Sequence, residues 1–316
     1  MPVCFAANFF FILLTGRTHR LFCVIVNPSQ TSYHSLKMNR MLIVVLLIAT
    51  LVVGQYTKEF SCQFKSDGVF EENVQQSLLR LTERPFIHFN DCEDALTKGH
   101  TMSGVYRIKP KASFRPFPVW CDMETDGGGW TLIQVRYDGS TDFFRNWVEY
   151  RNGFGSVDSE HWLGNNFIHQ LTENNDYQLK IEVNGFEENE FAFAKYSPFR
   201  IGSEDDNYKL EIGNFTSEGK ITDSLTYHNG AMFTTKDKQN DGHTSNCAIA
   251  CKGAWWYRQC YHSTLNGIWM SKLRSISTRG AQSNENIFGV HFRHTFDVDF
   301  YSLKSVEMKV RKMRLT

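Results

Sequence analysis

Alternating apolar and polar positions predict several β-strands beyond residue 100. Successive side chains of a strand point to opposite faces, so a strand with one buried face repeats every two residues. The strands expected on this pattern are residues 105–108, 117–121, 130–136, 177–183 and 190–196, and a closing strand is expected at 305–310. Residues 162–171 predict a helix. After about Gly213 the chain is rich in Gly, Asn and Asp, which predicts loops and therefore the binding region.

The first 54 residues carry a pattern typical of export. Residues 41–53 form an apolar run of 13 residues, and the basic stretch 37–40 precedes it, as in a secretory signal peptide. As a helix at about 1.5 Å per residue the run spans about 20 Å, short of the roughly 30 Å hydrocarbon core of a bilayer. We predict a signal peptide at residues 38–54 and an N-terminal extension of uncertain status at 1–37. The alternative is a signal anchor of type II orientation.

Residues 55–88 form a short connector with a helical pattern. An apolar face of about three turns, which ends at Pro85, contains Val69, Phe70, Val74, Leu78 and Leu81. Fewer than three heptads is short for a stable coiled coil. Cys62 stands at the head of this segment. It either forms an interchain disulfide that makes a homo-oligomer, or it stays intramolecular or free.

Composition and charge exclude several classes of protein. The 34 Lys and Arg balance the 34 Asp and Glu, so no net charge draws the chain to nucleic acid. The 26 Phe, 12 Tyr and 7 Trp predict a core of large aromatic side chains. The sequence has no Gly-x-Ser-x-Gly, His-Glu-x-x-His, P-loop or Rossmann pattern, so an enzyme is not expected.

Eight cysteines and one sequon fit an oxidising compartment. Six of the cysteines, at positions 62, 92, 121, 247, 251 and 260, follow the predicted signal peptide, and such spaced cysteines are typical of disulfides. Cys251 has no evident partner: it either pairs with Cys62 or remains free. The sequence Asn214-Phe-Thr216 is an N-glycosylation sequon in a segment expected to be exposed. We therefore predict a secreted, extracellular protein.

Three long strings of the sequence resemble one known family. They are GGGWTLIQVRYDGSTDFFRNWVEYRNGFG from residue 127, SEHWLGNNFIHQLT from residue 159 and NCAIACKGAWWYRQCYHSTLNG from residue 246. They are similar to the fibrinogen C-terminal globular domain, found in ficolins, tachylectin-like lectins, angiopoietin-type ligands and fibrinogen. The resemblance implies an α+β domain over residues 89–313, with a small N-terminal lobe, a central mixed sheet and a loop-rich C-terminal lobe. It also implies the disulfides Cys92–Cys121 and Cys247–Cys260.

The resemblance further implies a calcium loop in residues 236–246. The two acidic ligand positions of the family fall on Gln239 and Asp241, and the two carbonyl ligands on His243 and Ser245. Calcium prefers carboxylates but accepts amide oxygens, so Gln239 weakens the expected site, and Asp237 is a candidate to compensate. The alternative is a polar turn that holds no ion.

Next to this loop, the family's lectins bind acetyl groups in a small pocket. In many relatives the peptide bond before the second cysteine, here Gln259–Cys260, is cis. Where lectin-type relatives have tyrosines, this chain has Cys251 and Asn286, and Tyr261 followed by His262 stands where a histidine is common. The expected ligand pocket is thus formed by Cys251, Gln259, Cys260, Tyr261, His262 and Asn286. Trp255 and Trp256 are expected in the core.

These expectations lead to two hypotheses about function. The first is calcium-assisted, lectin-like recognition of glycans or acetylated surface groups in innate immunity, by several weak sites on an oligomer. The second is an extracellular signalling or matrix ligand that binds a protein receptor through the same C-terminal face. The Asp241 loop favours the first hypothesis, and the missing pocket tyrosines favour the second.

Overall fold

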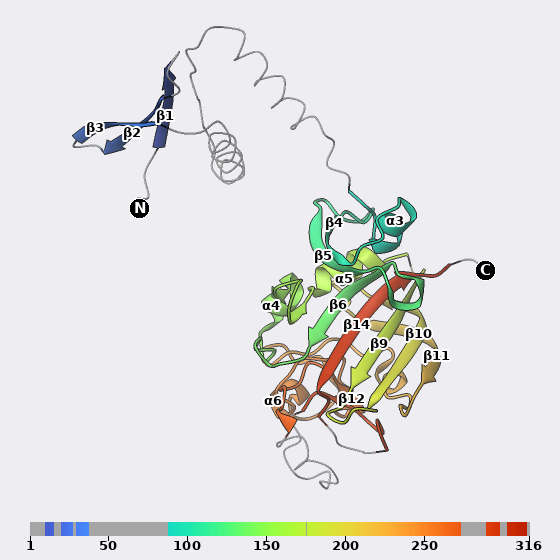
Figure 1. Cartoon of the computed structure of the whole chain (residues 1–316). Coiled ribbons are helices and arrows are strands. Elements are labelled where there is room, and N and C mark those ends of the chain that lie inside the picture. Colours follow the sequence, from blue (N-terminus) through green and yellow to red (C-terminus); the bar gives the residue numbers. More distant parts are fainter. Residues whose placement is uncertain are drawn as a thin grey trace. The chain divides into compact units, whose positions relative to one another are not determined.

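The computed structural model describes residues 88–174, 176–272, 289–297 and 302–314, together with the backbone of three strands between residues 10 and 37. The chain divides into two units, Met1–Phe86 and Ile87–Thr316. The first unit contains a three-stranded antiparallel sheet of β1 (Phe10–Thr15), β2 (Arg20–Asn27) and β3 (Gln30–Lys37) (Figure 1). The N-terminal extension predicted at residues 1–37 therefore includes strands.

Several predictions fall on residues that the structure does not describe. They are the signal peptide at 38–54, Cys62 and the connector from 55 up to residue 87. Across the part of the chain that is described, no helix is long and apolar enough to cross a membrane.

The second unit is built on a nine-stranded sheet. Its main path runs β11-β10-β9-β14-β6-β5-β4, and β8 pairs with both β6 and β7. The strands are β4 (Gly104–Ile108), β5 (Phe117–Asp122), β6 (Trp130–Arg136), β7 (Phe154–Gly155), β8 (His161–Trp162), β9 (Tyr177–Asn184), β10 (Phe191–Ile201), β11 (Leu210–Glu218) and β14 (Ser305–Lys312). These strands pair antiparallel, and a parallel bridge joins Phe89 to Ile108 at the edge. The predicted α+β fold is confirmed.

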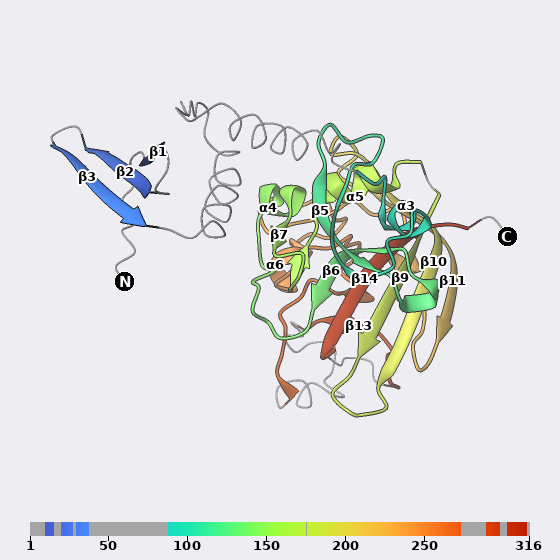
Figure 2. The ribbon, with the colours of Figure 1, turned by 45° about the horizontal axis from the view of Figure 1, so that its top comes forward.

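The C-terminal strand closes the sheet at its centre. Figure 1 and Figure 2 both show β14 between β6 and β9, and it pairs antiparallel with each of them. The closing strand predicted at 305–310 extends to Lys312. Because both neighbours come from much earlier in the sequence, the sheet is complete only when the end of the domain has returned to it.

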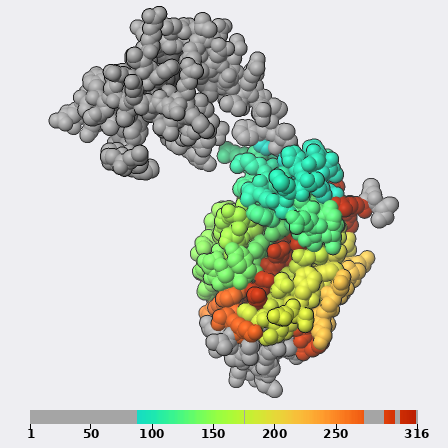
Figure 3. Space-filling model, in the orientation of Figure 1, coloured from blue at the N-terminus to red at the C-terminus, as the bar shows by residue number. Residues whose placement is uncertain are grey.

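Short helices and small strands flank the sheet. They are α3 (Cys92–Thr97), α4 (Trp147–Asn152), α5 (Asn165–Thr172), α6 (Cys247–Ala250), the 3₁₀ turns η1 (Thr125–Gly127) and η2 (Thr226–His228), and the pair β12 (Ser263–Thr264) and β13 (His291–Phe292). The N-terminal lobe of α3, β4 and β5 lies at one end of the unit, and α6 lies at the opposite end (Figure 1). In the space-filling view the N-terminal lobe likewise lies at one end of the unit, and the red C-terminal residues reach from the middle of the unit to this lobe (Figure 3).

Two elements differ from the sequence-based expectation. The helix expected from residue 162 begins at Asn165, because Trp162 belongs to β8 and its indole N–H donates to Asn165 Oδ1 at 3.0 Å. Strand β11 continues to Glu218, past the point after Gly213 where loops were expected. Its outer half is largely exposed, so pairing with β10 forms this part of the strand and apolar alternation does not mark it.

Large aromatic side chains fill the space between the sheet and the C-terminal loops. The ring of Phe233 lies 6.0 Å from Trp162, 5.3 Å from Tyr150 and 5.2 Å from Trp256. Trp255 and Trp256 are fully buried, as expected from the sequence. Burying one such ring stabilises the fold by about 2–3 kcal/mol, so this cluster forms a rigid base for the loops above it.

The glycine run before β6 allows a close approach in the N-terminal lobe. Gly128 has φ 74°, and a Cβ there would lie 2.3 Å from the carbonyl oxygen of Met123. Asp91 begins α3 by accepting the N–H of Asp94 at 2.7 Å, and Cys92 of this helix is bonded to Cys121 of β5. The lobe is thereby fixed against the sheet.

Candidate functional site

The disulfide between Cys247 and Cys260 organises the C-terminal lobe. It joins α6 to the segment that precedes β12, across 13 residues of sequence and with Cα atoms 5.3 Å apart. Closing a loop of this size stabilises the folded chain by about 3 kcal/mol, because the bond restricts the conformations open to the unfolded chain. Cys251, between them, keeps a free thiol that is only 4% exposed. Burial raises the pKa of this thiol to about 12, so Cys251 is protonated and unreactive at neutral pH.

The peptide bond between Gln259 and Cys260 is trans, which corrects the expectation of a cis bond. Among the described residues the cis bond is Ser197–Pro198. A peptide bond before a residue other than proline favours trans by about 3–4 kcal/mol.

His228 connects the aromatic core to the segment after the disulfide. Its Nε2 accepts the backbone N–H groups of His262 at 3.2 Å and Ser263 at 3.1 Å. Nδ1 therefore carries the proton and donates to the carbonyl oxygen of Trp256 at 2.7 Å. The ring is fully buried, and this desolvation lowers its pKa to about 3. A neutral His228 thus fixes the backbone on which His262 stands.

Tyr227 and His262 form a stacked pair beside the disulfide. Their ring centroids lie 3.9 Å apart with planes 15° apart, and both side chains are partly exposed. The backbone N–H of Gln259 also lies 3.4 Å from the hydroxyl of Tyr227. The pair therefore presents partly exposed aromatic rings together with hydrogen-bonding groups.

The structure places most of the predicted pocket residues together. Gln259 is exposed, and Cys260, Tyr261 and His262 are partly buried and follow it directly. Cys251 is buried close to Tyr261, so it cannot serve as an exposed wall of a pocket. Asn286 lies outside the described residues.

Tyr227, the partner of His262, was not among the site residues predicted from the sequence. Tyr227 is 35 residues away in sequence and sits in a polar segment with no motif. Its role arises only from the contact between η2 and the segment after Cys260, which no local signal could have revealed.

Asp237, the candidate to compensate for Gln239, contacts residues outside the predicted calcium ligands. Its Oδ1 accepts the backbone N–H of Trp147 at 2.8 Å and the hydroxyl of Thr235 at 2.7 Å. Asp237 therefore ties the loop to the start of α4.

The remaining loop residues form a closed set of hydrogen bonds. The side-chain nitrogen of Gln239 donates to Asp241 Oδ1 at 3.1 Å and to the carbonyl oxygen of His243 at 2.9 Å. Asp241 also accepts the backbone N–H of His243 at 3.1 Å and that of Cys247 at 3.2 Å. The ring nitrogen Nδ1 of His243 lies 3.1 Å from the carbonyl oxygen of Ser245. The predicted ligands Gln239, Asp241, His243 and Ser245 are thus neighbours.

As they lie, these groups do not fit a calcium ion. Calcium requires about six to eight oxygen ligands, whereas Gln239 directs N–H groups at the oxygens that would hold the ion. A second set of possible ligand atoms belongs to His243, Cys247 and Cys260, and these atoms lie within 4.8 Å of one another. The disulfide occupies both sulfurs of that set, so neither is a thiolate.

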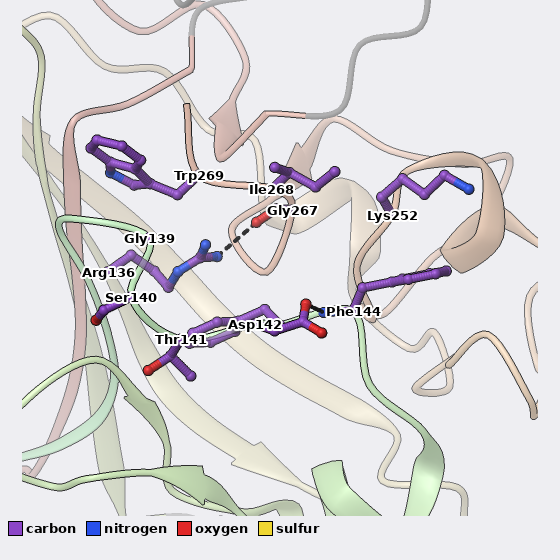
Figure 4. Close-up of a pocket in the computed structure, with 11 residues that line it drawn as sticks. Arg136, Gly139, Ser140, Thr141, Asp142, Phe144, Lys252, Gly267, Ile268 and Trp269 are labelled. Atoms are coloured by element: carbon purple, nitrogen blue, oxygen red, sulfur yellow. Dashed lines mark hydrogen bonds between the residues drawn. The ribbon is translucent and has the colours of Figure 1, made fainter. Parts of the chain in front are cut away.

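A separate hollow of about 320 Å³ opens between the loop after β6 and the segment after β12. In Figure 4, Arg136 points from β6 toward Gly267, and its Nη1 donates to that carbonyl oxygen at 2.8 Å. The same atom lies 3.2 Å from the carbonyl oxygen of Leu265, and Glu160 lies 3.8 Å from Nε. Arg136 therefore holds the 265–267 turn in place.

Comparison with known proteins agrees with this architecture. Human ficolin-3 is 42% identical over 240 residues, which cover 76% of this chain and 72% of ficolin-3. Ryncolin-4 of Cerberus rynchops is 42% identical over 71% of this chain and 61% of its own length. Tenascin-R of Gallus gallus is 41% identical over 72% of this chain but only 16% of its own length.

Solved structures give the same result. The fibrinogen-like globe domain of human ANGPTL2 matches with TM-score 0.65 and 41% identity, over 71% of this chain and 99% of that domain. A lamprey fibrin D-dimer, in complex with the peptide Gly-His-Arg-Pro-amide, matches with TM-score 0.64 and 28% identity, over 87% of this chain and 90% of the other. The family model for the C-terminal globular domain of fibrinogen beta and gamma chains matches residues 88–313. The chain belongs to the fibrinogen C-terminal domain family, whose members such as ficolins and tenascins are non-catalytic binding proteins.

Proposed function

We propose that this chain is a secreted, non-catalytic recognition protein that binds glycans or acetylated surface groups in innate immunity. The observation that carries the proposal is the stacked pair of Tyr227 and His262 beside the disulfide to Cys260. Aromatic faces bind sugar C–H groups and acetyl methyl groups by apolar contact, while nearby polar groups fix the orientation of the ligand. The exposed Gln259 next to this pair supplies such a polar group.

The similarity to ficolin-3 and ryncolin-4 supports a lectin-like role. The pair of rings covers a small area, so one site binds weakly. Several sites on a homo-oligomer raise the overall affinity without new contacts. We assign to Cys62 the interchain disulfide that would link the copies of this homo-oligomer. Two disulfides in the described part of the chain are consistent with an extracellular location.

A glycan array on the full chain tests the proposal. Binding should be strongest to acetylated sugars. We expect the same signal in calcium chloride and in EDTA, because the Gln239 amide faces the oxygens that would hold an ion. A silent array, with the protein shown to be folded by circular dichroism, would reject glycan recognition.

A protein partner is the second candidate function, and one observation favours it. Three large apolar side chains of the N-terminal lobe are exposed: Met102 by 78%, Val105 by 51% and Phe114 by 95%. All three lie between residues 102 and 114, and a contiguous apolar patch is typical of a surface that binds another protein. Similarity to tenascin-R and to the ANGPTL2 and ANGPTL6 globe domains agrees with a matrix or signalling role. Binding to cells that Phe114→Ser abolishes, together with a silent glycan array, would establish this alternative.

A further inference from the structure

Gln239 holds together two oxygen atoms that repel each other. Asp241 Oδ1 and the carbonyl oxygen of His243 both carry negative charge, and both accept from the one amide nitrogen of Gln239, at 3.1 Å and 2.9 Å. A side-chain amide nitrogen has two hydrogens, so it can donate to both oxygens at once.

The position of this amide is that of a cation in a metal loop. A calcium ion stabilises such a loop by accepting electron density from a carboxylate and from carbonyl oxygens that face one point. In this chain the side-chain nitrogen of Gln239 bridges the Asp241 carboxylate and the His243 carbonyl by donating to both. Unlike a calcium ion, the amide carries no net charge, so it holds the Asp241 carboxylate by hydrogen bonding alone.

The effect of this contact extends to the disulfide. Asp241 Oδ2 accepts the backbone N–H of Cys247 at 3.2 Å, so the carboxylate joins the Gln239 turn to the first residue of α6. Asn246 strengthens the same closure, because its Nδ2 donates to the carbonyl oxygen of Thr235 at 2.9 Å. The loop is therefore tied at both ends by hydrogen bonds within the protein.

We infer that the side-chain amide of Gln239 replaces the metal ion in this loop, so that the fold of the C-terminal lobe is independent of calcium. Asp237, the nearest candidate to supply a second carboxylate, is turned to Trp147 and Thr235. The inference concerns the stability of the loop and does not rest on the identity of the ligand, so the test below uses no glycan.

The test compares the full chain with the variants Gln239→Asp and Gln239→Ala, by thermal unfolding in calcium chloride and in EDTA. Wild type should melt at the same temperature in both solutions. Gln239→Ala removes both hydrogen bonds and should melt about 2–4 °C lower in both solutions. Gln239→Asp removes the amide and adds a carboxylate that repels Asp241. It should melt below wild type in EDTA and gain about 5–10 °C in calcium at about 100 times its Kd.

A double variant and calorimetry complete the test. Gln239→Asp combined with Asp241→Asn should lose the gain in calcium, because one carboxylate is again missing. Isothermal titration calorimetry should detect calcium binding to Gln239→Asp and none to wild type. Calcium binding to wild type that Asp241→Asn removes would overturn the inference. A Gln239→Asp variant that gains nothing in calcium would overturn it as well, since the amide would then not stand in the place of an ion.

Discussion

The rings of Tyr227 and His262 lie face to face, with centroids 3.9 Å apart and planes 15° apart. Tyr227 belongs to η2 and His262 to the segment after Cys260, and His228 of η2 joins the two by accepting the backbone N–H of His262. The pair is therefore held in position before a ligand arrives. A preformed surface loses little conformational entropy on binding, which suits a small and weak site.

Removing the ring of Tyr227 should reduce ligand binding. We expect Tyr227→Ala to weaken binding to acetylated sugars by about tenfold, because the loss of one aromatic contact costs about 1–1.5 kcal/mol. Tyr227→Phe keeps the ring and should retain most of the affinity. Surface plasmon resonance on immobilised ligand measures both variants.

Phe114→Ala is the control for Tyr227→Ala, since Phe114 is 95% exposed and belongs to the N-terminal lobe. It should bind like wild type. Equal binding by wild type and Tyr227→Ala would show that the stacked pair is not the contact surface.

Stability should fall as the pH is lowered below about 6.5, and His228 should account for part of this loss. Burial lowers the pKa of folded His228 from 6.5 to about 3. Between these values the unfolded chain binds a proton that the folded chain does not. The contribution of His228 to the free energy of unfolding is therefore fully present above about pH 6.5. It decreases toward pH 3, by up to about 1.4 kcal/mol per pH unit.

Urea unfolding at pH 7 and pH 5 measures this effect. His228→Phe should unfold earlier at pH 7 by about 3 kcal/mol, because two backbone N–H groups and one carbonyl lose their partner. Its stability should also depend less on pH than that of wild type. Burial also lowers the pKa of His161, but His161 is present in both proteins, so the difference reports His228. Parallel pH slopes for the two proteins would contradict the assignment.

The sequence was sufficient for the sheet and insufficient for the site, and the reason is physical. Residues 177–183 place their apolar side chains on one buried face, and residues 130–136 are apolar enough to be buried on nearly every side, so both strands could be identified locally. The outer half of β11 is exposed and is formed by its neighbour, so it gave no such signal. The contact of Tyr227 with His262 depends on how two loops meet.

Position 239 shows the same limit within a recognised motif. The resemblance to the calcium loop located Gln239 as the residue that departs from the pattern. It did not show which side of the amide faces Asp241, because the orientation depends on where the carbonyl of His243 lies.

Lys309 is a buried cation on which three carboxylates depend. Its side chain is 1% exposed, and Nζ lies 2.8 Å from Asp122, 2.5 Å from Glu182 and 3.2 Å from Glu307. Lys309→Met should destabilise the domain by about 3–5 kcal/mol, because Asp122 would remain in the sheet without its cation and Glu182 would keep only Lys180. Urea unfolding at pH 7 measures this loss.

Lys98→Met is the matched control for Lys309→Met. Lys98 pairs with Asp94 on the surface, at 2.9 Å and with a side chain that is 49% exposed. A surface pair of this kind contributes at most about 1 kcal/mol. If both methionine variants lose the same small amount, the buried cluster is not a determinant of stability.

Asn214 should carry an N-linked glycan that protects the edge of the sheet. It is exposed on β11, the last strand on the sheet's path, whose outer backbone groups have no neighbouring strand among those described. An unpaired edge is a template for association with another chain, and a bulky polar glycan blocks that approach. Asn214→Gln should shift the mass of the secreted protein by one glycan and increase aggregation in light scattering at raised temperature.

Thr216→Val removes the same glycan but keeps Asn214, so it should aggregate to the same extent. Aggregation by Asn214→Gln alone would assign the effect to the asparagine side chain rather than to the glycan.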